Sequence, residues 1–260
     1  MSYETIEYAT QGRVALITLN RPERMNAWTP QMASDQAAAI TAANEDDDVG
    51  AIVMTGAGRG FCAGADMQAT FGKRLDGVDP GNNTAEGSGG MPADVDWVGL
   101  MRSSKPLIAA VNGAAVGIGM TMILPFDVIV ASERAKFGMF FVKVGLTPEL
   151  ASTHFLVQRV GFGRASEMCL TASLYEAGEA FRMGLADRLV AHDDLVPSAT
   201  ALAEQMASNP VRQLRMTKSL LTANAVDTDL EAVQARESEL IRECRKSPEH
   251  REAVAAFLAR

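Results

Sequence analysis

The sequence has little cysteine, no long apolar run and a deficit of positive charge. Its three cysteines, Cys62, Cys169 and Cys244, lie far apart, which fits neither a disulfide framework nor a zinc site. That pattern suits a reducing compartment, so we predict a cytoplasmic protein. No run of about 18 apolar residues occurs, and residues 1–5 do not resemble a signal peptide, so no membrane association is expected. The net charge of −8 argues against a general nucleic-acid-binding protein.

The 260 residues are enough for one large domain, and a composition of 47% hydrophobic and 22% charged residues is ordinary for a globular protein. Apolar segments at residues 50–54 and 107–111 predict buried strands. Thr29 and Pro30 predict the start of a helix that runs to about residue 44. This alternation predicts an α/β core over residues 1–195. Residues 196–260 are expected to be helical and to make contacts between copies of the chain.

The most informative stretch is the glycine-rich segment at residues 56–67, which follows the predicted strand at 50–54 and is expected to turn helical at Gly64. Backbone N–H groups at a strand-to-helix turn have no partner inside the helix and lie at the positive end of its dipole. A second turn of small residues, 112–120, follows the strand at 107–111. Two such turns can place two N–H groups around one oxygen, as in an oxyanion hole for an enolate. The alternative is a pair of tight turns without a ligand.

Several further motifs accompany these turns. They are Asn20-Arg21-Pro22 with Met25-Asn26-Ala27, residues 61–66, Lys105-Pro106 with residues 110–113, Phe126-Asp127, Phe137-Gly138 and residues 255–258. Together they closely resemble the crotonase family, which includes enoyl-CoA hydratases and isomerases. The resemblance covers essentially the whole chain. It implies an α/β fold of the ClpP/crotonase type, a spiral of ββα units with a C-terminal helical trimerisation region. Homotrimers, or hexamers built from two trimers, are the implied assemblies.

The resemblance also implies a site for an acyl-CoA thioester. In it, the N–H groups of Ala63 and Ile118 hold the thioester carbonyl oxygen. The implied substrate-binding residues are Arg24, Ala27, Ala63, Gly64, Ala65, Asp66, Met67, Ile118 and Phe141. From the residues alone, Arg24 is equally a solvated surface arginine, and Asp66 is a helix cap. Coenzyme A enters as part of the substrate, so no separate cofactor is expected, and no metal-ligand spacing is present.

The sequence departs from the family's hydratases at the catalytic positions. Those enzymes use two glutamates to activate a water, and the matching positions here are Thr121 and Phe141, neither of which can act as a base. A carboxylate follows at Glu149. One branch of the family, the peroxisomal-type Δ3,Δ2-enoyl-CoA isomerases, has its catalytic glutamate there, and an isomerase type of phenylacetate breakdown has aspartate. Burial would raise the pKa of Glu149 toward neutrality. The alternative is that Glu149 only stabilises a helix N-terminus.

We therefore predict an isomerase that converts 3-enoyl-CoA into 2-enoyl-CoA, nearest to the family members that carry a single catalytic carboxylate. Glu149 would remove a proton from C2 and return it to C4. One alternative is a hydratase or another enolate-type lyase that uses Glu149 and water. A second alternative is a non-catalytic acyl-CoA-binding or RNA-associated protein. The sequence does not fix the acyl chain, and the glycine-rich residues 72–90 are expected to form a mobile surface loop that covers a pocket.

Overall fold

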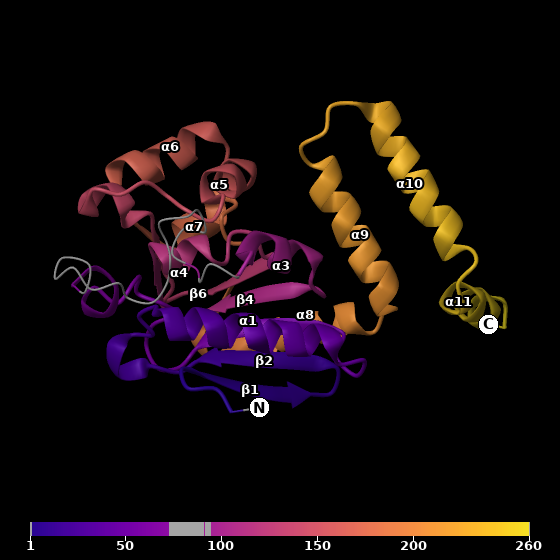
Figure 1. Cartoon of the computed structure of the whole chain (residues 1–260), viewed down its shortest axis with the longest axis horizontal. Coiled ribbons are helices and arrows are strands. Elements are labelled where there is room, and N and C mark those ends of the chain that lie inside the picture. Colours follow the sequence, from indigo (N-terminus) through magenta and orange to yellow (C-terminus); the bar gives the residue numbers. More distant parts are fainter. Residues whose placement is uncertain (1, 73–90, 92–94, 260) are drawn as a thin grey trace.

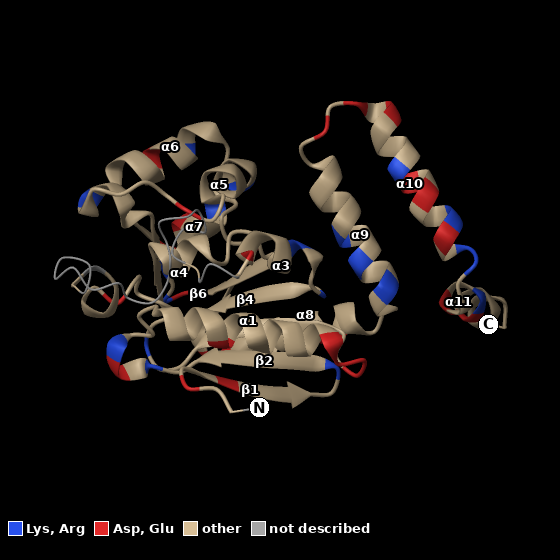
Figure 2. Ribbon diagram, in the orientation of Figure 1, with Lys and Arg blue, Asp and Glu red and all other residues tan. Residues whose placement is uncertain are grey.

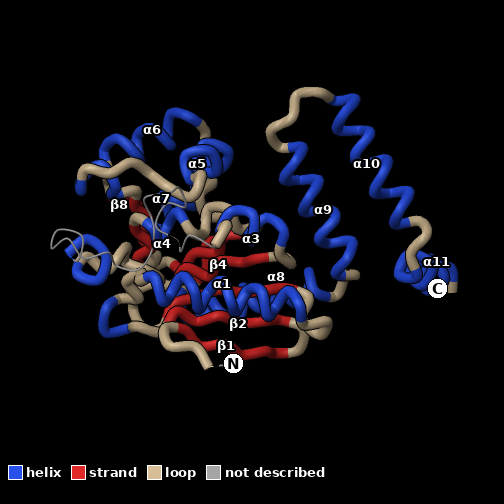
Figure 3. The backbone as a smooth tube through the Cα atoms, viewed as in Figure 1, coloured by secondary structure: helices blue, strands red, loops and turns tan. Residues whose placement is uncertain are grey.

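The computed structural model describes residues 2–72, 91 and 95–259, and within them a six-stranded sheet lies between layers of helices (Figure 1, Figure 3). The strand order is β1-β2-β3-β4-β6-β9, in which β1 is antiparallel to β2 and the later neighbours are parallel. A three-stranded sheet, β5-β7-β8, lies apart from it. The strands are β1 (Ile6–Gln11), β2 (Val14–Leu19), β3 (Ala51–Gly56), β4 (Leu107–Val111), β5 (Ala114–Val116), β6 (Val128–Ser132), β7 (Lys136–Gly138), β8 (Leu174–Glu176) and β9 (Arg188–Val190). The predicted α/β class is confirmed.

Helices connect these strands and then continue to the end of the chain. They are α1 (Pro30–Glu45), α3 (Trp97–Ser103), α4 (Ile118–Thr121), α5 (Ser152–Val160), α6 (Phe162–Thr171), α7 (Ala177–Met183), α8 (Leu195–Ala207), α9 (Val211–Asn224), α10 (Leu230–Cys244) and α11 (Pro248–Leu258), with short turns η1 (Pro22–Arg24), η2 (Gln68–Gly72), η4 (Phe140–Val144) and η5 (His192–Asp194). The α1 helix begins as predicted, because the Thr29 hydroxyl accepts a hydrogen bond from the N–H of Met32. The predicted loop at residues 72–90 lies outside the described residues, apart from Gly72.

The central strands are apolar throughout because both of their faces are buried. On one face, residues such as Ile17, Ile52 and Met54 pack in a large core with α1. On the other face, a smaller core forms between the sheet and α8, with Val53 and Leu202 among its members. Helix α8 therefore belongs to the packing of the sheet. The predicted boundary after residue 195 is wrong in this respect, because it assigns that helix to the C-terminal region.

The C-terminal arm, α9–α11, extends away from the sheet (Figure 1). Figure 2 shows basic positions along α9 and charges of both signs along α10. Several large apolar side chains of the arm are exposed: Leu221, Val226, Leu230, Ile241, Val254, Phe257 and Leu258. No helix within the described ranges is long and apolar enough to cross a membrane.

A buried ion cluster around Asp127 attaches the arm to the core. The Asp127 carboxylate accepts hydrogen bonds from Arg102 Nη1 of α3 at 3.1 Å, from the N–H of Leu107 at 2.8 Å and from Lys218 Nζ of α9 at 2.7 Å. Arg102 also donates to the hydroxyl of Thr222 on α9. Burial lowers the pKa of Lys218 to about 8, although the Asp127 carboxylate opposes that shift.

We expect Asp127→Ala to lower the free energy of unfolding by about 3–5 kcal/mol, because it leaves the Lys218 ammonium buried without its counter-charge. Urea denaturation monitored by circular dichroism measures the change. The matched control is Glu176→Ala, which breaks the exposed ion pair with Lys136 and is expected to cost less than about 1 kcal/mol. Equal losses in the two variants would contradict the anchoring role of Asp127.

Candidate active site

The loop after β3 is held by two buried asparagine side chains. Asn26 Nδ2 donates to the carbonyl oxygens of Ala57 at 2.9 Å and Gly60 at 2.8 Å. Asn112 Nδ2 donates to the carbonyl oxygens of Gly58 at 2.9 Å and Gly60 at 3.2 Å. The two bonds to Gly60 satisfy a buried carbonyl group, and all four bonds fix the course of the loop. Both asparagines belong to the motifs Met25-Asn26-Ala27 and residues 110–113, but their role as loop anchors could not be predicted from the sequence.

The segment that follows pairs with β5 on one side. The N–H of Cys62 donates to the carbonyl of Ala114 at 2.8 Å, and the carbonyl of Cys62 accepts from the N–H of Val116 at 3.0 Å. This parallel bridge brings the glycine-rich segment against the second turn of small residues, as the sequence predicts. The main chain of the two turns is therefore in direct contact.

The same segment pairs with Trp28 on its other side. The N–H of Trp28 donates to the carbonyl of Gly64, and the N–H of Asp66 donates to the carbonyl of Trp28, both at 2.8 Å. Ala65 lies between these two bonds, and its own N–H points away from Trp28. Within the described ranges, the N–H groups of Ala65 and of Ile118, the first residue of α4, have no hydrogen-bond partner. Two unpaired donors thus come from the two adjoining turns.

Glycine is required where the turns approach one another. Gly64 and Gly117 have φ of 106° and 54°, in the left-handed region that favours glycine. A Cβ on Gly117 would lie 4.0 Å from the Cα of Gly64, and a Cβ on Gly119 would lie only 2.1 Å from the carbonyl oxygen of Cys62. The absence of side chains at these positions therefore sets the spacing of the two turns.

Two expectations about this segment are wrong. The N–H of Ala63 donates to the carbonyl of Met25 at 3.1 Å, so it is not free to bind a substrate oxygen. The chain also does not become helical at Gly64, because Ala65 forms a bridge with Trp28 and the next helical turn, η2, begins at Gln68. The free N–H of Ala65 therefore belongs to a bridged segment rather than to a helix N-terminus.

Asp66 has a structural partner that the sequence analysis had not identified. Its carboxylate accepts from Arg21 Nη2 and from the N–H of Ala69, both at 3.1 Å. Burial alone would raise the pKa of Asp66, but these hydrogen bonds outweigh it and hold the pKa below the usual value. The contact with Ala69 agrees with the capping alternative for Asp66. Arg21 also donates to the carbonyl of Ala27, so it fixes the main chain beside the site.

The other predicted binding residues lie on several different elements. Arg24 ends η1 and is exposed, Ala27 is half-buried, and Met67 is exposed. Phe141 is buried in η4. No contact in the structure assigns these four residues a ligand, so their binding roles stay predictions.

Glu149 lies in the loop between η4 and α5 and is half-buried. Burial raises the pKa of its carboxyl from 4.5 to about 7, and no charged group contributes to this shift. A carboxyl group that titrates near neutrality is suited to accept and return a proton. The residues at the two hydratase positions, Thr121 and Phe141, are buried side chains without acid or base function, and the Thr121 hydroxyl faces the carbonyl of Ile118 at 3.4 Å.

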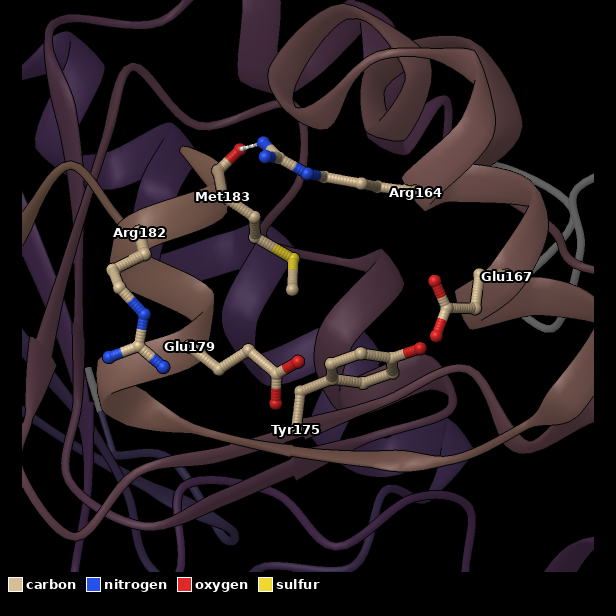
Figure 4. Close-up of a pocket in the computed structure, with 6 residues that line it drawn as sticks. All are labelled: Arg164, Glu167, Tyr175, Glu179, Arg182 and Met183. Atoms are coloured by element: carbon tan, nitrogen blue, oxygen red, sulfur yellow. Dashed lines mark hydrogen bonds between the residues drawn. The ribbon is translucent and has the colours of Figure 1, made fainter.

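A pocket of about 250 Å³ lies elsewhere, between α6, β8 and α7 (Figure 4). Figure 4 shows the Tyr175 hydroxyl directed toward the Glu167 carboxylate. The lining residues are Arg164, Glu167, Tyr175, Glu179, Arg182 and Met183. They include neither unpaired donor nor Glu149. Its two arginines and two glutamates balance in formal charge.

The two turns and Glu149 provide the kinds of groups that enolate chemistry requires. Two unpaired N–H groups can stabilise negative charge on a carbonyl oxygen, and Glu149 is a carboxyl with a near-neutral pKa. Among the described residues, no group of three His, Cys, Asp or Glu side chains is arranged to hold a metal ion.

Comparison with known proteins agrees with this chemistry. A family model described as enoyl-CoA hydratase/isomerase matches residues 9–260. A probable enoyl-CoA hydratase of Rhizobium meliloti is 37% identical over 100% of this chain and 97% of its own. The 1,2-epoxyphenylacetyl-CoA isomerase of Escherichia coli is 34% identical over 95% of this chain and 92% of its own. A crystal structure of an enoyl-CoA hydratase subunit from Geobacillus kaustophilus superposes with a TM-score of 0.85 at 33% identity, covering 99% and 96% of the two chains.

Proposed function

The chain belongs to the enoyl-CoA hydratase/isomerase family, and from that premise we propose that it is an acyl-CoA isomerase that converts 3-enoyl-CoA into 2-enoyl-CoA. The observation that carries the proposal is Glu149, a half-buried residue whose carboxyl has its pKa raised to about 7 by desolvation. The hydratase positions hold Thr121 and Phe141, so the pair of carboxylates that would activate water is lacking. A single carboxyl is sufficient for a reaction that only moves a proton.

In the proposed mechanism, the Glu149 carboxylate removes a proton from C2 of the substrate. The C–H electron pair then forms the C1–C2 double bond, and the carbonyl electrons move onto the thioester oxygen. The N–H groups of Ala65 and Ile118 hold this oxygen, with Ala65 in place of Ala63 because its N–H is unpaired. When the dienolate collapses, C4 takes the proton back from Glu149 and the double bond lies between C2 and C3.

The substrate-binding role of the surrounding residues is part of the same proposal. Gly64, Asp66 and Met67 would border the coenzyme A moiety, with Arg24 near its phosphates and Ala27 beside it, while Ala63 would line the site without donating its N–H. Phe141 would contribute to the acyl pocket. Because the proton leaves and returns on one carboxyl, the reaction as written requires no cofactor beyond the coenzyme A of the substrate.

A second candidate function is hydration of 2-enoyl-CoA, in which Glu149 activates a water. The names of several relatives favour it, since the Rhizobium protein is called a probable hydratase. The name of the Escherichia coli relative favours an isomerisation instead, on an epoxide substrate. A non-catalytic acyl-CoA-binding or RNA-associated protein is the third alternative.

A paired assay tests the proposal. We expect the purified protein to convert 3-enoyl-CoA of several chain lengths into 2-enoyl-CoA, with hydration of 2-enoyl-CoA near background. The substrate panel also includes 1,2-epoxyphenylacetyl-CoA. Hydration as the main activity would establish the second candidate, and binding without turnover of any substrate would establish the third.

We further propose that the C-terminal arm makes the contacts of a homotrimer or of a hexamer. Its exposed apolar side chains, including Leu230 and Phe257, are the surface that such contacts would cover. Light scattering of the full chain gives the mass of the assembly. A cytoplasmic location and the lack of a nucleic-acid partner stay predictions from composition.

A further inference from the structure

Residues 149–152 form a hydrogen-bonded turn whose two central residues have the left-handed backbone conformation. The N–H of Ser152 donates to the carbonyl of Glu149 at 3.0 Å, and the two residues between them, Leu150 and Ala151, have φ of 56° and 51°. Two consecutive left-handed residues in a hydrogen-bonded turn normally require asparagine or glycine. Leucine and alanine are disfavoured there because the Cβ crowds the carbonyl oxygen.

The surrounding structure holds this turn in place. The side chain of Leu150 is buried in the large core. The carbonyl of Ala151 accepts from the N–H groups of His154 at 3.0 Å and Phe155 at 3.3 Å, which begin α5. Helix α5 is itself fixed, because Arg159 donates to the carbonyl oxygens of Leu124 and Phe126. An unfavourable backbone conformation that is secured on both sides points to a functional constraint.

The turn decides how Glu149 relates to α5. If residues 150 and 151 were right-handed, α5 would extend back to Glu149. The carboxylate would then lie in the first helical turn, where free N–H groups and the helix dipole favour its ionised form. In the structure, the N–H of Ser152 bonds to the main chain of Glu149, and those of His154 and Phe155 bond to the main chain of Ala151. No main-chain donor contributes to the titration of the Glu149 carboxyl.

We propose that Leu150 and Ala151 are positioning residues: their left-handed turn separates Glu149 from the N-terminus of α5 and keeps its half-buried carboxyl away from the main-chain donors there. The inference rests on the proposed function in that it takes Glu149 to be the base. The turn thereby determines the environment in which this base exchanges its proton.

A series of substitutions at residue 151 tests the inference, because the Ala151 side chain is exposed and its replacement leaves the core intact. Valine is strongly disfavoured in the left-handed region, whereas glycine adopts this conformation without steric strain. We expect Ala151→Val to reduce kcat by about 10- to 100-fold through displacement of the base. We also expect it to lower the apparent pKa of the pH–rate profile from about 7 toward 4.5. Ala151→Gly is expected to keep both kcat and the profile of the wild type.

The matched control is Thr153→Val, which places the same side chain at an exposed, right-handed position of α5 two residues further on. It is expected to leave the profile unchanged. A thermal unfolding midpoint that falls in Ala151→Val with an unchanged profile would show a purely structural turn and overturn the inference. So would a shifted profile in Ala151→Gly. If the valine variant does not fold, Ala151→Thr, which is also β-branched, takes its place.

A titration that needs no substrate separates this inference from the proposed function. Difference infrared spectroscopy follows the protonated Glu149 carboxyl, identified by the band that Glu149→Gln removes. We expect this band to titrate near pH 7 in the wild type, in Ala151→Gly and in Thr153→Val, and at lower pH in Ala151→Val. If the band shifts as expected but no isomerisation occurs, only the proposed function fails. If it titrates identically in all variants, the positioning role is refuted whatever the activity.

Discussion

Glu149→Gln is expected to lower kcat for 3-enoyl-CoA isomerisation by about 10²- to 10⁴-fold, the range over which general bases contribute. Glutamine has nearly the shape of glutamate but cannot accept the C2 proton, so KM should stay close to the wild-type value. In the wild type, kcat/KM should rise with pH and reach half its maximum near pH 7, because the carboxyl must be ionised to act and its pKa is about 7. Steady-state kinetics of both proteins between pH 5 and pH 9 measure this.

Stability provides a check on Glu149 that does not depend on the substrate. The pKa of the folded carboxyl, about 7, lies above 4.5, so between these values the folded state binds more protons than the unfolded state. The free energy of unfolding should therefore fall as pH rises from 4.5 to about 7, by at most about 3 kcal/mol, and this component should be constant at higher pH. Glu149→Gln removes that dependence and should be more stable than the wild type at pH 8.

The control for Glu149→Gln is Glu176→Gln, which neutralises an exposed carboxylate on β8. It should leave isomerisation and its pH dependence unchanged. If Glu149→Gln isomerises 3-enoyl-CoA at the wild-type rate, another residue moves the proton. A pH profile without an inflection near 7 would contradict the buried environment assigned to this carboxyl.

Gly119→Ala is expected to reduce kcat/KM by about 10²- to 10³-fold, comparable to the loss of one oxyanion donor. The new Cβ would lie 2.1 Å from the carbonyl oxygen of Cys62, and because that atom belongs to the backbone, the two turns must move apart. The N–H groups of Ala65 and Ile118 would then no longer be placed to hold one oxygen as proposed. Isomerisation kinetics, combined with binding of a non-reactive acyl-CoA, measure the effect.

The matched control is Gly163→Ala on α6, where an added Cβ meets nothing within 4 Å. This change is expected to leave activity unaltered and to stabilise the helix slightly, by about 0.5–1 kcal/mol. Far-ultraviolet circular dichroism establishes that both variants are folded. Full activity in a folded Gly119→Ala protein would mean that the two turns do not hold the reacting oxygen.

The sequence was sufficient to predict the elements that bury long apolar runs. The strands β3 and β4 are continuous apolar stretches, and α1 has a capping threonine followed by proline, so local patterns and tertiary packing agree. The three-residue strands β5 and β8 are too short for any periodicity to show. The packing of α8 on the sheet was also missed, because an amphipathic helix does not specify which surface it will cover.

In the site, too, local sequence patterns were sufficient to locate segments, but contacts between distant residues decide the detailed geometry. The motifs located the two glycine-rich turns, but the choice between Ala63 and Ala65 as a donor depends on pairing with Met25 and Trp28, which are far away in the sequence. The left-handed turn after Glu149 could not be predicted either. Its residues, leucine and alanine, favour a helix, and only burial of the Leu150 side chain and the fixed position of α5 impose the other hand.

Cys62 lies in the glycine-rich segment that carries the Ala65 N–H, and its burial affects how readily it is oxidised. Cys62 is fully buried, and burial raises the pKa of its thiol to about 11, so on the order of one molecule in ten thousand carries the thiolate at pH 7. Peroxides and disulfides react with thiolates, and they need access to the sulfur. Cys169 and Cys244 are both partly exposed. Oxidative damage is therefore expected at these two residues before it reaches Cys62, whose sulfur is enclosed by the protein.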